Sequence, residues 1–194
     1  MRRTDDPCRF CRLYAIAVVG FAALLGAFTA GQLLLEALVA PGTQTVFPLA
    51  QSAVRSLGAA ASGSALLLAL VLWAHPLSAP RLQQDLRKIL TRGLLVTLPG
   101  FLVAALLATA IGALVIAASG RSTGGAFELT STDVLAGALV AVLDAGLILF
   151  LSARLLPRLS QSGFSLPAKL VLALTVSVAL RATLGLLAGS ALSG

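Results

Sequence analysis

The chain has 194 residues, of which 58% are hydrophobic and 11% are charged, and its mean hydropathy is +1.00 with a formal net charge of +7. Soluble domains average about 45–50% apolar and about 25% charged residues, so this composition excludes soluble globular domains, disordered chains and nucleic-acid-binding modules. Two cysteines and one histidine also exclude a disulfide scaffold and a bis-histidine haem site within one chain. We therefore expect an all-α, polytopic integral membrane protein.

Five segments are apolar over the roughly 20 residues that a helix needs to cross a bilayer. We expect a bundle of five transmembrane helices at residues 13–40, 50–74, 94–119, 133–156 and 170–192. Residues 1–12 form a cytoplasmic tail in this interpretation, and residues 13–194 form a single transmembrane domain. The first apolar stretch is too long for the hydrophobic region of a signal peptide, so we expect it to remain uncleaved. Pro157 is expected to close the fourth span.

The segment 80–92 between the second and third spans has an amphipathic pattern. Leu82, Leu86 and Ile89 recur at helical spacing, with charged residues on the other face. This pattern predicts a short cytoplasmic amphipathic helix lying on the membrane surface. Its basic residues would then contact anionic lipid or a partner: Arg81, Arg87, Lys88 and Arg92. The alternative is a solvated connector whose basic residues only set the topology.

The distribution of Lys and Arg predicts the orientation. Eleven of these residues fall on one side of the five-span arrangement: Arg2, Arg3, Arg9, Arg12, Arg81, Arg87, Lys88, Arg92, Arg154, Arg158 and Lys169. The positive-inside rule then places the N-terminus in the cytoplasm and the C-terminus outside. Tyr14 and Trp73 fall at the expected cytoplasmic interface, where aromatic belts lie. The preference for Arg over Lys is typical of GC-rich bacterial genomes, so we expect a bacterial inner membrane.

Shifting the sequence by 80 residues aligns the first two expected spans with the next two. Arg12 then matches Arg92, and the pair Gly20-Phe21 matches Gly100-Phe101. This alignment suggests a parallel two-span tandem repeat plus one further helix, an arrangement known in transporters. Chance matches in an Ala/Leu-rich chain are the alternative.

Four ionisable residues lie inside the expected spans, where such residues are costly and are functional candidates. Asp144 and Arg181 both lie roughly 17 Å from the outer end of their spans, so we predict an intramembrane ion pair between them. Its role is either to fix neighbouring helices, or to bind or relay an ion, or to face a partner's helix. Glu36 and Arg55 lie nearer the outer surface and form a second candidate pair, unless each reaches the headgroups.

Small residues at four-residue spacing predict close helix packing. The fourth span carries Gly137 and Ala141 in such a stripe, and the fifth span carries Gly185 and Gly189. We expect these residues to make helix packing or oligomer contacts, with Gly185 and Gly189 the best candidates for an external surface.

No catalytic constellation is visible in the sequence. Cys8 and Cys11 have CxxC spacing, but a zinc site favours a second such pair or additional histidines. Asp133 is expected at the surface as the cap of the fourth span. We therefore expect no enzyme activity, no cofactor, no metal site and no nucleic-acid partner.

Two functions remain open. The first is a non-catalytic membrane component, such as a subunit, assembly factor or regulator, with a membrane-protein partner or a homo-oligomer in the lipid bilayer. The alternative is a small oligomeric transporter or channel that uses the Asp144–Arg181 pair.

Overall fold

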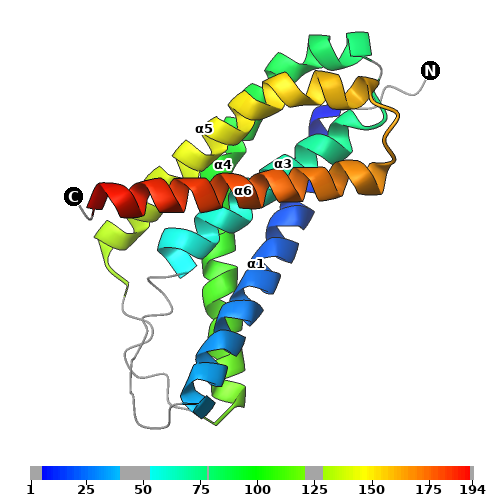
Figure 1. The fold of residues 1–194 in the computed structure, drawn as a ribbon. Helices are drawn as coiled ribbons and strands as arrows, with labels where there is room; N and C mark the ends of the chain where they lie inside the picture. Colours follow the sequence, from blue (N-terminus) through cyan, green and yellow to red (C-terminus); the bar gives the residue numbers. More distant parts are fainter. Residues whose placement is uncertain (1–5, 40–52, 78, 121–128, 193–194) are drawn as a thin grey trace.

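In a computed structural model of the chain, the described residues are 6–39, 53–77, 79–120 and 129–192. In chain order they form α1 (Asp6–Val39), the π-helical turn η1 (Ala53–Leu57), α3 (Gly58–Ala74), α4 (Ala79–Ala118), α5 (Ser131–Gln161) and α6 (Leu166–Leu192) (Figure 1). These described segments contain no strand, so the all-α prediction is confirmed for them.

Four of the described helices are long and apolar enough to cross a membrane. The apolar segments are Arg9–Leu35 in α1, Arg55–Ala74 across η1 and α3, Gln84–Ala118 in α4 and Ser131–Leu159 in α5. The corresponding described segment of α6, Leu166–Ala179, is shorter. Length and composition are thus compatible with a multi-pass membrane protein.

The short helix α3 is the centre of the bundle. It packs against α1, α4, α5 and α6, and α6 lies across the other helices in Figure 1. In the most apolar window of α3, 72% of the residues are buried, against 28–33% in α1, α4 and α5. The outer helices therefore turn wide apolar faces outward, as helices in lipid do.

Small residues set the distances between these helices. A Cβ atom added to Gly26 of α1 would lie 2.8 Å from the carbonyl oxygen of Ala108 in α4. One added to Gly58 at the start of α3 would lie 2.9 Å from the Cβ of Ala105 in α4. Helix backbones in membranes approach this closely only where such side chains are missing.

The segment 80–92 is helical, as expected, but it is not a separate surface helix. It forms one helix with the following span, because α4 is continuous over 40 residues and about 60 Å, twice the roughly 30 Å of a hydrocarbon core. Leu82, Leu86 and Ile89 belong to the main core cluster. The surface-helix interpretation is therefore wrong for this apolar face, because the bundle itself buries it.

α5 also extends beyond its expected end. Pro157 lies inside the helix, which continues to Gln161, so the prediction that this proline closes the span is wrong. A proline removes one backbone hydrogen bond from a helix. Pro157 lies about one turn before the end of α5, so few helical residues follow the missing bond.

The expected aromatic belt is not formed by Tyr14 and Trp73. Their residues are 4% and 0% exposed, so both lie inside the bundle. Tyr14 stacks on Phe10 with 6.3 Å between ring centroids, and Gly100 of α4 leaves room for its phenol ring. The nearest apolar surface for these rings is another helix rather than the lipid interface.

Most of the described basic residues lie at one end of the bundle, where α1, α4 and α6 begin and α3 and α5 end (Figure 1). We call it the basic end. The described basic residues on these helix ends are Arg9, Arg12, Arg81, Arg87, Lys88, Arg92, Arg154, Arg158 and Lys169.

The two halves of the suggested repeat occupy different environments. Gly20 has no atom within 4 Å of an added Cβ, whereas its counterpart Gly100 lies against Tyr14. The counterparts α3 and α5 also differ, because α3 is central and α5 is peripheral. The matching residues therefore do not make equivalent contacts.

Candidate functional site

Polar side chains lie at three positions along the axis of η1 and α3, and at each position α5 or α6 packs against these helices. Arg55 and Asp133 lie at the end opposite the basic end, Ser64 and Ser177 lie between the two ends, and Lys169 lies at the basic end. Polar groups inside membrane helices are costly and are commonly functional. These positions are therefore the candidate sites.

At the opposite end, Arg55 of η1 forms an ion pair with Asp133 in the first turn of α5. The Asp133 side chain is fully buried, whereas that of Arg55 is 56% exposed. Thr130 is the N-cap of α5. Its hydroxyl donates to Oδ2 of Asp133 at 2.6 Å and accepts from the Asp133 backbone N–H at 3.3 Å. Asp133 therefore both completes a capping box and binds η1 to α5.

This arrangement differs from the expected one. Asp133 is buried at the third helical position rather than being the exposed cap residue, because Thr130 takes the N-cap position. The Thr-x-x-Asp pattern of residues 130–133 is a signal for this capping box. The partner of Arg55 in the structure is Asp133, while the Glu36 side chain lies outside the described residues.

Between the ends, the hydroxyl oxygens of Ser64 in α3 and Ser177 in α6 lie 3.5 Å apart. Asp144 of α5 is buried, only 8% exposed. Arg181 follows Ser177 by four residues, or about one helical turn. The Arg181 side chain lies outside the described residues, so the Asp144–Arg181 ion pair stays a prediction.

Of the four small residues expected to make packing or oligomer contacts, the surroundings are described only for the two in α5. Ala141 is fully buried in a cluster with Ala59, Phe101 and Ala105, and Gly137 is buried as well. Gly185 and Gly189 belong to α6, but their surroundings lie outside the described residues.

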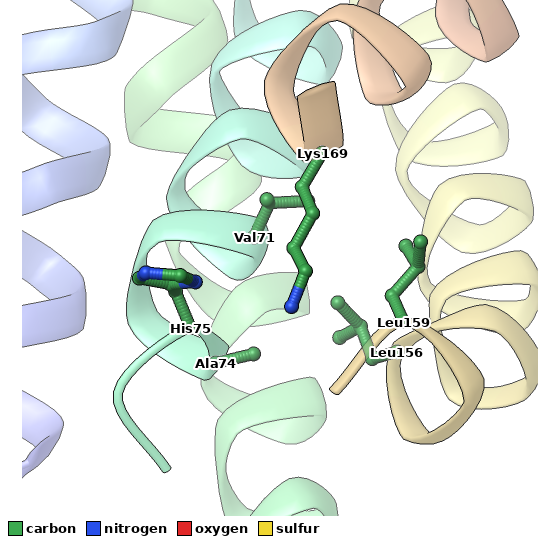
Figure 2. Close-up of a pocket in the computed structure, with 6 residues that line it drawn as sticks. All are labelled: Val71, Ala74, His75, Leu156, Leu159 and Lys169. Carbon is green, nitrogen blue, oxygen red and sulfur yellow. The ribbon is translucent and has the colours of Figure 1, made fainter. Parts of the chain in front are cut away.

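At the basic end, Lys169 is buried in a small pocket between three helices. The lining residues are Val71, Ala74 and His75 from the end of α3, Leu156 and Leu159 from α5, and Lys169 itself from the first turn of α6. Figure 2 shows the Lys169 ammonium pointing into this pocket, toward the end of α3. Lys169 is 6% exposed and lies inside α6, not just before the helix as the expected span 170–192 implied: it begins the buried stripe of α6 that continues through Ala173 and Ser177.

The other basic residues of this end are exposed. Arg81, Arg87, Lys88 and Arg92 lie on α4 with their side chains in the open, opposite the buried stripe of Leu82, Leu86 and Ile89. They form a cationic strip on the outer face of α4.

The CxxC pair lies in the first turns of α1. Cys11 is an exposed free thiol, and the Cys8 side chain lies outside the described residues. Among the described residues, no three His, Cys, Asp or Glu side chains lie close enough to hold a metal ion. His75 lines the Lys169 pocket instead.

Several glycines face away from the bundle. An added Cβ would meet no atom within 4 Å at Gly20 and Gly31 of α1, or at Gly146 of α5. Leu24 and Ala27 are exposed between the two α1 glycines. With 3.6 residues per turn, residues 20, 24, 27 and 31 share one helix face. We call this set the α1 outer face.

Neither a protein-family model, nor a curated protein, nor a solved structure matches this chain. The function is therefore inferred from the geometry of the described residues.

Proposed function

We propose that the protein is a non-catalytic component of a membrane complex, and that it packs against another membrane protein through the α1 outer face. The observation that carries this proposal is the open space at Gly20 and Gly31. At glycines inside the bundle, such as Gly26, the backbone of a neighbouring helix occupies the space where a Cβ atom would lie. Gly20 and Gly31 would allow an equally close approach of another helix, and they lie on the outside of the bundle.

The composition of this face supports a protein partner. Glycine costs about 1 kcal/mol relative to alanine inside a helix, and two glycines on a face that meets only lipid would bring no compensating contact. Between membrane helices, small residues permit close packing that lipid does not require. The exposed Leu24 would fill a gap between two residues of the partner helix.

The polar groups support a structural rather than a chemical role. Asp133 caps α5 and pairs with Arg55. Ser62 and Thr97 donate to backbone carbonyls of their own helices, and Ser64 meets Ser177 across the α3–α6 contact. These contacts hold helices in place without assembling a nucleophile and a base.

The proposed setting is a bacterial inner membrane with five crossings, in which α6 forms the fifth. The support for this orientation is the collection of Arg and Lys at the basic end, which the positive-inside rule assigns to the cytoplasm. The C-terminus would then be external.

A transporter or channel is the second candidate, and the buried Asp144 is the observation that favours it. A carboxylate at this depth is a candidate ion or proton site. Flux into proteoliposomes containing the purified protein tests this alternative: transport that is lost in Asp144→Asn would support it, and no flux with either protein would exclude it for the ions tested.

Native mass spectrometry of the protein, extracted gently from its own membrane, tests the main proposal. We expect a stoichiometric second membrane protein with the wild type. Gly31→Leu should remove it, whereas the matched control Gly146→Leu places the same side chain in equally open space on α5 and should keep it. A homo-oligomer alone, or equal effects of the two substitutions, would contradict the proposal.

A further inference from the structure

We propose that the Lys169 pocket binds the phosphate of an anionic phospholipid headgroup at the basic end. The site lies between α3, α5 and α6, away from the exposed cationic strip of α4 and away from the α1 outer face. It is independent of the proposed partner contact, so either proposal can fail without the other.

The burial of the Lys169 ammonium is the first argument. Among the described Lys and Arg side chains, it is the buried one, at 6% exposed. Its pocket is lined by aliphatic residues and His75, and no described carboxylate forms an ion pair with it. A buried charge without a counter-ion is costly, so an anion at this place would be strongly stabilised.

The helix ends around Lys169 provide only part of this compensation. α3 and α5 both end beside the pocket, and the negative ends of their dipoles, about half an elementary charge each, favour an ammonium group. α6 begins there, and the positive end of its dipole acts in the opposite sense. These partial charges are smaller than the full charge of the ammonium group, so an anionic ligand would still stabilise it.

The charge of the surroundings would concentrate such a ligand. Arg154 and Arg158 are exposed on the same part of α5 that lines the pocket with Leu156 and Leu159. Basic residues at a membrane surface attract anionic lipid. The pocket therefore opens within a region where phosphate groups of lipids accumulate.

The size and lining of the pocket favour a lipid over a soluble anion. The pocket is partly open and has room for about one water molecule, so one phosphate oxygen can enter while the rest of the headgroup stays outside. Apolar side chains surround the ammonium, and Phe164 is exposed in the turn just before α6. These groups fit the glycerol and acyl part of a phospholipid, and a free phosphate ion would leave them without contact.

The chain offers a matched control, because it has only two lysines. The wild type, Lys169→Gln and Lys88→Gln are equilibrated with equal amounts of phosphatidylglycerol and phosphatidylcholine, and native mass spectrometry measures the ratio retained. Loss of one charge-assisted hydrogen bond should lower the phosphatidylglycerol preference of Lys169→Gln about tenfold. Lys88→Gln removes the same charge from an exposed position, where salt screens it, and should change the ratio less than about threefold.

A second measurement uses the unmodified protein and remains valid if Lys169→Gln does not fold. Acetylation rates of the two lysines are compared in phosphatidylcholine vesicles with and without phosphatidylglycerol. We expect phosphatidylglycerol to slow acetylation of Lys169 about tenfold, and that of Lys88 much less, because only Lys169 gains a direct phosphate contact.

Three results would overturn the proposal. Equal lipid ratios for wild type and Lys169→Gln, with equal lysine acetylation in both vesicle types, would show that no phosphate contacts Lys169. Equal losses in the two lysine variants would show a general surface attraction instead of a site. Protection of Lys169 by millimolar inorganic phosphate but not by phosphatidylglycerol would assign the site to the free anion.

Discussion

Arg55 and Asp133 form an ion pair that joins the beginning of α3's apolar segment, through η1, to the beginning of α5. The same carboxylate accepts hydrogen bonds from the backbone N–H and the hydroxyl of Thr130. One buried group therefore fixes two helix starts at the end of the bundle opposite the basic end. Substitution of Asp133 should therefore lower the stability of the protein more than substitution of the exposed Arg55.

We predict that Asp133→Ala lowers the melting temperature in detergent more than Arg55→Gln does. The alanine removes both the capping box and the ion pair, whereas Arg55→Gln leaves the Thr130 contacts intact. Thr130→Ala, which removes the cap, should cost about 1 kcal/mol. A larger loss for Arg55→Gln than for Asp133→Ala would contradict this prediction and would show that the unpaired buried carboxylate costs more than the loss of the cap.

The contact between Gly26 and Ala108 predicts a clear difference between two glycine substitutions. Gly26→Ala places a methyl group against the backbone of α4 and should lower the free energy of unfolding by about 1–3 kcal/mol. Gly146→Ala on the open face of α5 should be neutral or should raise it by up to about 1 kcal/mol, because alanine favours helices. Denaturation in mixed micelles measures both, and equal effects would contradict the α1–α4 contact.

The position of α6 across α3 can be tested by cross-linking. In a variant with both native cysteines replaced by serine, Ser64→Cys with Ser177→Cys should form a disulfide under mild oxidation, since the two hydroxyls are 3.5 Å apart. Ser62→Cys with Ser177→Cys is the control, because the Ser62 hydroxyl bonds to Ala59 of its own helix. Efficient cross-linking of the control pair, and none of the first, would place α6 elsewhere.

The orientation of the bundle can be tested with the exposed thiol of Cys11. With Cys8 replaced by serine, a membrane-impermeant maleimide should label Cys11 in inside-out vesicles and not in intact cells. Leu129→Cys at the other end, in a background without the native cysteines, should show the reverse. A Cys11 that reacts in intact cells would reverse the proposed orientation.

The helices of this protein were largely predictable from the sequence, because apolar length alone identifies membrane-spanning segments. The extent of α4 was not, although the periodicity of Leu82, Leu86 and Ile89 was plain. An apolar stripe shows that a helix face is buried, but it does not show whether lipid or another helix covers it. In this protein the other helices of the bundle cover the stripe, and the segment 80–92 and the following span form one continuous helix.

The candidate sites were predictable only in part. The sequence pairs Arg55 with Glu36 and gives Asp133 only a capping role. The packing of η1 on α5 brings Arg55 to Asp133. The expected span 170–192 leaves Lys169 outside the fifth helix, because this residue precedes the fully apolar part of α6. Its burial follows from the contact of α6 with α3, which no local pattern encodes.

The central claim is that the α1 outer face contacts another membrane protein, and site-specific photo-cross-linking in native membranes tests it most directly. A photoreactive residue at position 24, between Gly20 and Gly31, is compared with one at position 143, because Leu24 and Leu143 are 65% and 64% exposed on different helices. We expect position 24 to form one discrete adduct with a second membrane protein and position 143 to react with lipid. Lipid adducts alone at position 24, or an adduct between two copies of this chain, would contradict the claim.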